Sequence, residues 1–117
     1  MNIEKIKYIK LSLMKKKSEI NKDNKSDYEI YSSAMFNITP ELYDERLFSL
    51  LPDEIYKDLI SKNNIDNKDY LGIWINYNDE IYENAVSLQT IDDMIRYGDK
   101  DINPIYEIFK MTLNLND

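Results

Sequence analysis

In residues 71–77 an apolar side chain stands at every second position, and this pattern constrains the fold more than any other segment does. Alternation with a period of two is typical of a strand that buries one face. Asn78 and Asp79 follow at once and are turn-forming residues, and a second alternating stretch lies around Val86 and Leu88. The segment therefore predicts two antiparallel strands joined by a tight turn.

Two further alternating stretches, residues 6–14 and 30–38, predict strands that pair with each other near the N-terminus. The polar residues 15–27 between them predict a long exposed hairpin loop. A helix is the alternative for the first stretch, because some of its apolar residues also recur every three or four positions. These residues are Ile3, Ile6, Ile9 and Leu13.

The middle of the chain predicts two helices. Thr39, Pro40 and Glu41 have the residue types of a helix start, with a capping hydroxyl, a proline at the first position and an early acid. We expect Pro52 to end or kink this helix and Asp53 to begin the next one. The expected apolar stripes are Leu42, Leu47, Leu50 and Leu51 in the first helix, and Ile55, Leu59 and Ile60 in the second.

Two more helices are expected after the second pair of strands. Thr90 has the residue type of an N-cap, and Gly98 is typical of a C-terminal stop. Asn103 and Pro104 open the last helix. Its predicted inward-facing residues are Ile105, Ile108, Phe109 and Leu113.

The strands therefore occur in adjacent pairs instead of alternating singly with helices. This order predicts the α+β class, with an antiparallel sheet of about four strands and helices packed on one face. The 117 residues suffice for a single compact domain, 1–117, with a Lys-rich N-terminal hairpin at 1–38. An all-α bundle is the alternative, because several apolar residues lie near heptad spacing. They are Trp74, Tyr77, Ile81, Leu88, Ile91 and Ile95.

The residue inventory excludes much catalytic chemistry. The chain has no Cys and no His, which removes thiolate nucleophiles, histidine proton shuttles and the common zinc sites. With two Gly residues it has no glycine-rich phosphate loop. Asp99, Asp101 and Asn103 match the first ligand positions of a calcium loop, but Pro104 and Lys110 stand where that loop needs glycine and glutamate. We expect no catalytic residues, no cofactor and no metal, hence a protein that is not an enzyme.

Charge is distributed unevenly along the chain. Residues 1–26 hold eight Lys and three acidic residues, a net charge of +5, whereas residues 27–117 hold seven basic and nineteen acidic residues, a net charge of −12. A mostly acidic body repels phosphate backbones and is attracted to basic surfaces. Lysines interrupt the first apolar stretch, and no apolar run approaches 18 residues. We therefore expect a soluble, cytoplasmic protein that binds neither nucleic acid nor membrane.

Acidic and aromatic residues gather at the turn of the second strand pair. Tyrosine supplies a large contact area at low entropic cost in recognition surfaces. A partner-binding patch is predicted here, together with two acidic residues of the following helix. Its residues are Tyr77, Asp79, Glu80, Tyr82, Glu83, Asp92 and Asp93.

The leading hypothesis is a small non-catalytic inhibitor that binds and blocks a basic partner, such as a nuclease or another nucleic-acid-binding effector, by taking the place of phosphates. In size and charge the chain is similar to immunity proteins of bacterial toxins, antitoxins and anti-CRISPR proteins, although no motif carries this likeness. One alternative is a self-associating structural or regulatory module. Another is a nucleic-acid binder that uses the N-terminal lysines Lys5, Lys7, Lys10, Lys15, Lys16 and Lys17.

Overall fold

Four strands form one antiparallel sheet in the order β2-β1-β3-β4 in the computed structural model, which describes residues 1–17 and 28–114. The strands are β1 (Ile6–Lys16), β2 (Tyr28–Asn37), β3 (Tyr70–Tyr77) and β4 (Glu80–Ser87). The helices are α1 (Glu45–Phe48), α2 (Leu51–Lys62), α3 (Leu88–Tyr97) and α4 (Pro104–Asn114), with short 3-10 turns at Ile3–Lys5 and Pro40–Leu42. The predicted α+β class is confirmed, and the all-α alternative is wrong.

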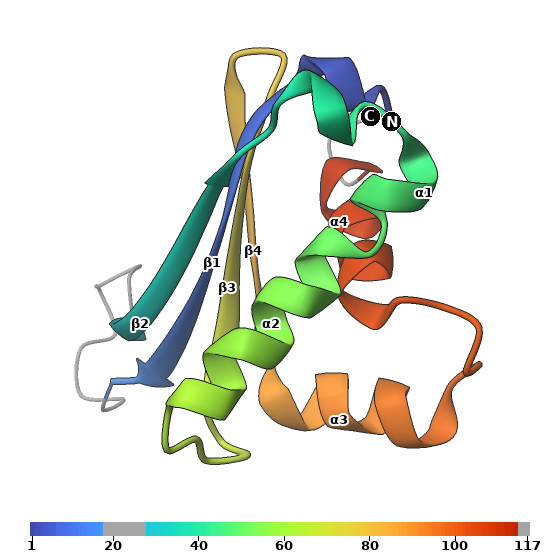
Figure 1. Cartoon of the computed structure of the whole chain (residues 1–117). Helices are drawn as coiled ribbons and strands as arrows, with labels where there is room; N and C mark the ends of the chain where they lie inside the picture. Colours follow the sequence, from blue (N-terminus) through green and yellow to red (C-terminus); the bar gives the residue numbers. More distant parts are fainter. Residues whose placement is uncertain (18–27, 115–117) are drawn as a thin grey trace.

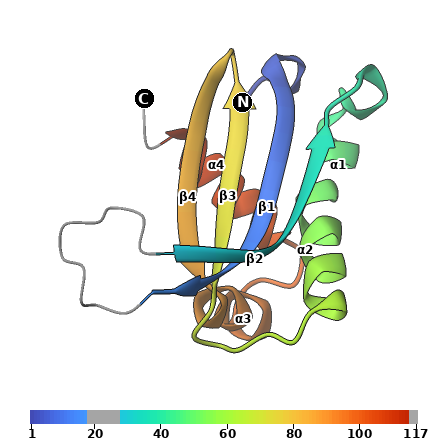
Figure 2. The same ribbon diagram turned by 90° about the vertical axis from the view of Figure 1, so that its left-hand side faces the viewer.

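The helices lie on one side of the sheet, as Figure 1 shows. Figure 2 looks onto the opposite side, against which no described helix packs. The core lies between the sheet and the helices, where alternate strand residues meet the buried faces of α2, α3 and α4. Six strand residues in this core are 0% exposed: Ile9, Leu11, Leu13, Leu71, Ile73 and Ile75. Alternation predicted them because successive strand residues point to opposite faces.

The turn between β3 and β4 has the predicted residues. Asn78 (φ 54°) and Asp79 (φ 66°) both adopt the left-handed conformation that a two-residue hairpin turn requires. The first two strands also pair as expected, with Ile9 opposite Phe36 and Leu11 opposite Ala34. The helical alternative for the first stretch is wrong. Most of the predicted loop 15–27 lies outside the described residues.

The prediction for residues 39–51 is wrong in detail. Thr39 makes no capping hydrogen bond through its side chain, and only a 3-10 turn follows it. Asp44 is the residue that caps α1, because its Oδ1 accepts the backbone N–H groups of Arg46 and Leu47 at 2.8 and 3.3 Å. Leu47 is 51% exposed in this short helix. Of the expected apolar stripe, Leu42 and Leu51 pack against the core from outside α1, whereas Leu50, like Leu47, is exposed.

The expected break between the two helices is present, but α2 begins at Leu51, two residues before the expected start at Asp53, so Pro52 lies inside its first turn. Its missing N–H removes no intrahelical hydrogen bond at that position. Ser87, not Thr90, caps α3, and its Oγ accepts the Thr90 N–H at 3.1 Å. Gly98 ends α3 as predicted, with its N–H donating to the Met94 carbonyl at 3.0 Å.

The last helix, α4, begins against α2. The carboxylate of Asp53 accepts the backbone N–H groups of Ile105 and Tyr106 at 3.0 and 3.2 Å. Asp53 is only 8% exposed, so this cap comes from a distant part of the chain and is buried. The four inward-facing residues predicted for α4, Ile105, Ile108, Phe109 and Leu113, are all buried.

Candidate functional site

The predicted patch at the β3–β4 turn forms only in part. Asp79 forms an ion pair with Lys7. Glu80 accepts a hydrogen bond from the Tyr82 hydroxyl at 3.1 Å, and Glu83 accepts one from the Trp74 indole N–H at 3.1 Å. Each acid at this turn therefore already has a partner within the chain. Lys5 and Lys7, at the start of β1, also lie beside the turn and weaken its negative potential.

Asp92 and Asp93 do not join this patch. They lie on α3, which follows the other end of β4, and Figure 1 shows α3 at the opposite end of the sheet from the turn. At about 3.3 Å per residue, the length of β4 separates the two places by roughly 25 Å. Asp92 pairs with Arg96 at 2.8 Å, and Asp93 accepts a hydrogen bond from Gln89 at 3.0 Å.

The tyrosine side chains of the patch also turn inward. Tyr77 and Tyr82 pack with ring centroids 6.2 Å apart, both against the core. Among the described tyrosines, only Tyr43 and Tyr97 are exposed. Five tyrosines pack in or against the core, and four of these also use their hydroxyls in hydrogen bonds: Tyr31, Tyr77, Tyr82 and Tyr106.

The N-terminal lysines are dispersed. Lys7 lies near the β3–β4 turn, and Lys15 lies at the far end of β1 and binds Asp69. Lys10 is on the side of the sheet that the helices leave uncovered, where its Nζ is 5.1 Å from the centroid of the Trp74 ring. Of this set, Lys15 and Lys16 do lie together, because both line a pocket of about 750 Å³ with Lys68, but Asp66 and Asp69 line the same pocket and offset part of its positive charge.

Acidic residues concentrate on the helical side. We call residues 40–66 and 88–114 the helix layer. It holds twelve acidic and six basic residues, a net charge of −6, whereas the four strands hold three acidic and four basic residues. Nine of the twelve acids are exposed. The chain's negative charge is therefore sorted onto one side, which the sequence order does not reveal because the layer combines two separate segments.

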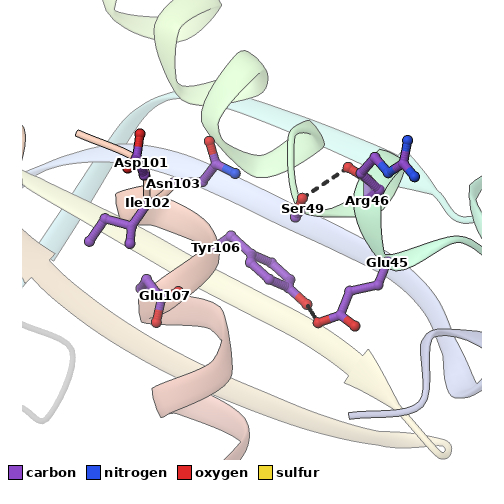
Figure 3. A pocket seen from close by; sticks show the side chains of 8 residues that line it. All are labelled: Glu45, Arg46, Ser49, Asp101, Ile102, Asn103, Tyr106 and Glu107. Atoms are coloured by element: carbon purple, nitrogen blue, oxygen red, sulfur yellow. Dashed lines mark hydrogen bonds between the residues drawn. The ribbon is translucent and has the colours of Figure 1, made fainter. Parts of the chain in front are cut away.

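A groove of about 380 Å³ lies in this layer between α1 and the start of α4, and we call it the α1–α4 groove. Its charged lining consists of three carboxylates and one guanidinium, from Glu45, Asp101, Glu107 and Arg46. Figure 3 shows Tyr106 pointing toward Glu45 across the groove, and its hydroxyl donates to Glu45 Oε1 at 3.1 Å. Burial, the hydrogen bond to Glu45 and its negative charge raise the pKa of Tyr106 to about 12.

Exposed apolar side chains accompany the acids of the helix layer. Ile102 lines the groove and is 37% exposed, and Leu47 and Leu50 lie exposed on and just after α1. Acids beside exposed apolar groups can bind a cationic side chain through its charge and its methylene stem. Sequence patterns missed this site because Leu47 and Leu50 were expected to be buried.

Asp69 is the centre of a second cluster of titratable residues, which the sequence did not indicate. It is 4% exposed and accepts hydrogen bonds from the Tyr31 hydroxyl at 2.7 Å and the Lys15 Nζ at 3.2 Å. The backbone N–H of Asp66 donates to it at 3.1 Å. Burial disfavours the charged form, but these donors outweigh burial and hold the pKa of Asp69 below its usual value. Both oxygens are used within the chain, so this cluster ties β1, β2 and the segment before β3 together.

Among residues 1–17 and 28–114, no group of three or more acidic side chains is arranged to hold a metal ion. In the same ranges, no helix has both the length and the apolar composition needed to cross a lipid bilayer. The chain matches no protein-family model, no curated protein sequence and no solved structure.

Proposed function

We propose that this protein is a non-catalytic inhibitor that binds a basic partner protein, such as a nuclease or another nucleic-acid-binding effector, through its helix layer. The observation that carries the proposal is the sorting of charge, with a net −6 on the helix layer and a nearly neutral set of strands. A surface with one sign of charge steers association toward the opposite sign and repels nucleic acid.

The α1–α4 groove is the best candidate for the centre of this contact. Asp101 forms no ion pair with another described residue, whereas Glu107 pairs with Lys110 at 2.9 Å. A lysine or arginine of the partner would bind these carboxylates in place of phosphate, which is how an acidic surface competes with nucleic acid. Ile102 offers an apolar wall, and exposed Leu47 and Leu50 extend the contact beyond the groove. Specific interfaces contain both apolar and polar groups, and this surface supplies both.

The test compares two variants that each remove two negative charges. The groove variant carries Asp101→Asn and Glu107→Gln, which leave the hydrogen bond between Tyr106 and Glu45 intact. The matched turn variant carries Asp79→Asn and Glu80→Gln, at the patch that the sequence favoured. Both keep similar side-chain size, and thermal unfolding followed by circular dichroism checks that both fold.

Each protein is then used as bait in an extract of the native host. We expect the wild type and the turn variant to retain the same basic protein, and the groove variant to retain at least tenfold less of it. The nucleic-acid-directed activity of that protein should fall to zero when one equivalent of the wild-type chain is added. Equal retention by both variants would refute the groove as the contact. The inhibitor hypothesis would be refuted if the retained proteins are not basic, or if they stay active when saturated with the wild-type chain.

A further inference from the structure

A cavity of about 400 Å³ lies between α2, α3 and the segment that joins α3 to α4, and we call it the α2–α3 cavity. Figure 1 shows these three parts on the same side of the sheet. Sites for small molecules are concave and mostly apolar, with volumes of about 300–1,000 Å³ and a few polar groups that fix the ligand. The cavity has this size, so the chemistry of its walls decides what it can bind.

Apolar side chains form much of the wall. Ile60 comes from α2, Met94 and Ile95 come from α3, and Ile102 and Pro104 come from the chain that follows α3. Ile95 is 51% exposed and Ile102 is 37% exposed, so the cavity leaves apolar surface in contact with solvent. An apolar molecule in the cavity would cover this surface, and the removal of apolar surface from water is favourable.

Tyr56 brings an unused hydroxyl to the cavity. Its side chain lines the cavity and is only 5% exposed. The other four tyrosines in or against the core all use their hydroxyls in hydrogen bonds, whereas the Tyr56 hydroxyl has no partner among the described residues. Among the described side chains, Asn76 Oδ1 is the one polar atom that is both sealed from solvent and unpaired, so the Tyr56 hydroxyl is open to the cavity. A nearly buried polar group without a partner costs free energy, which a ligand can recover by accepting its hydrogen bond.

This hydroxyl is a donor at neutral pH. Burial and the negative charge of Asp92 raise the pKa of Tyr56 to about 12, so the proton stays on the oxygen. Asp92 itself pairs with Arg96 at 2.8 Å, and this pairing offsets its repulsion of an anion in the cavity. The Tyr56 hydroxyl therefore calls for an acceptor on the ligand.

Two acids and two lysines also line the cavity, and they differ in what they bind. Asp53 accepts the first backbone N–H groups of α4, and Asp99 Oδ1 accepts the Asp101 N–H at 2.9 Å. Lys57 and Lys100 form no ion pair with another described residue. The carboxylates are thus used within the chain, while the two ammonium groups remain available for an anion.

We propose that the α2–α3 cavity binds a small carboxylic acid with an apolar body. Its carboxylate accepts a hydrogen bond from the Tyr56 hydroxyl and pairs with Lys57 and Lys100, and its apolar body lies against the α3 side of the wall. An ionised acceptor suits these donors, because charge-assisted hydrogen bonds are about twice as strong as neutral ones. None of the three donors lines the α1–α4 groove, so this site goes beyond the inhibitor function and does not depend on it.

The probe is sodium octanoate, with octanol as its uncharged match and octylamine as its cationic match. Each is titrated at pH 7 into the isotope-labelled chain, and NMR chemical shifts report where it binds. We expect octanoate to bind with a dissociation constant below about 1 mM and to shift the methyl signals of Met94, Ile95 and Ile102 most. Octanol and octylamine should bind at least fivefold more weakly, because neither offers an anion to the two lysines.

Two tyrosine variants test the hydroxyl. Tyr56→Phe keeps the ring, and octanoate should bind it at least fivefold more weakly. Its urea midpoint should not fall, because the hydroxyl has no partner in the free chain. Tyr31→Phe is the matched control, since the Tyr31 hydroxyl donates to Asp69 at 2.7 Å. This variant should unfold at lower urea concentration and bind octanoate as the wild type does.

Two lysine variants test the charge. Lys57→Gln/Lys100→Gln should weaken octanoate binding at least tenfold and leave octanol binding unchanged. Lys5→Gln/Lys10→Gln removes the same net charge far from the cavity and should change neither.

The proposal would be overturned by a chain that binds no octanoate at about 10 mM, or by shifts that lie away from the cavity. Octylamine that binds as tightly as octanoate, Tyr56→Phe that binds as tightly as the wild type, or equal losses in the two lysine variants would overturn it too. No partner protein is present, so this result is independent of the inhibitor test.

Discussion

Gly72 lies in the middle of β3, buried on the side of the sheet turned away from the helices and two residues from Trp74. A Cβ at position 72 would stand 2.6 Å from Trp74 Cη2 and 2.9 Å from Met14 Cε. The six-membered ring of Trp74 thus occupies the space that a side chain at position 72 would need. Residues two apart on a strand share a face, so the sequence shows that the two are neighbours, but it does not show which way the ring turns.

We expect Gly72→Ala to lower the free energy of unfolding by about 1–3 kcal/mol, because the added methyl group forces the tryptophan ring out of its place. In a Trp74→Ala background the same change should cost less than half as much, since only the flexible end of Met14 remains in the way. Urea unfolding of the four chains measures both costs. Equal costs in the two backgrounds would show that the ring is not the obstacle.

Asp69 provides a residue-scale test of pH dependence. The hydrogen-bond donors around Asp69 lower its pKa in the folded chain. The charge of Asp69 therefore stabilises the fold at pH values above its pKa in the unfolded chain, which is about 3.9. This stabilisation is lost as the pH falls through the lower pKa of the folded chain. We expect Asp69→Asn to be less stable than the wild type by about 1–3 kcal/mol at pH 7. The difference should shrink as the pH is lowered below about 4. Urea unfolding from pH 7 to pH 2.5 measures it, and a difference that grows on acidification would contradict the assignment.

At the scale of elements, the cap of α4 joins two helices that are distant in the chain. Asp53 belongs to the first turn of α2, yet its carboxylate accepts the first backbone N–H groups of α4. The start of α4 at Asn103 and Pro104 is predictable from the sequence. The role of Asp53 in α4 is not, because a cap supplied from 52 residues away leaves no local pattern.

We expect Asp53→Ala to lower the free energy of unfolding by about 1–2 kcal/mol, the usual cost of losing an N-cap. The loss should be local, because the two N–H groups that it leaves without an acceptor both belong to α4. Hydrogen exchange should therefore speed up most at Ile105 and Tyr106. Asp44→Ala is the matched control, since it removes the cap of α1 and should leave exchange in α4 unchanged. Faster exchange spread evenly over the sheet would contradict a local role.

The same scale shows where sequence patterns succeed and where they fail. The strands were predictable because one face of each is buried in a single continuous core, so burial repeats with a period of two. Residues 39–51 misled the prediction because their leucines suggest one amphipathic helix, while Asp44 interrupts it with a stronger local cap. Leu47 and Leu50 then stay exposed, and the side chain that reaches the core is Phe48.

At the scale of the whole molecule, the important property is which charged residues lie on the same side of the fold. The sequence shows a basic N-terminal segment and an acidic remainder, and this suggests a molecule with two ends of opposite charge. The fold instead makes β1 an inner strand of the sheet, spreads its lysines along the length of that strand, and gathers the acids of two separate segments into the helix layer. We therefore propose the α1–α4 groove, and not the β3–β4 turn, as the contact, because long-range pairing decides which acids that are distant in the sequence become neighbours.

This arrangement predicts how fast the chain binds a basic partner. An acidic layer attracts a basic protein over distances comparable to the Debye length, which falls from about 30 Å at 0.01 M salt to about 3 Å at 1 M. The association rate constant with the protein identified by the bait experiment should therefore fall at least tenfold between 20 and about 500 mM NaCl, while the dissociation rate constant changes much less. Stopped-flow measurement of the wild type, the groove variant and the turn variant separates the effect of local charge on the association rate constant from that of net charge, because the two variants have the same net charge. We expect a shallower salt dependence for the groove variant than for the turn variant, and a rate independent of salt in the wild type would rule out electrostatic steering by the helix layer.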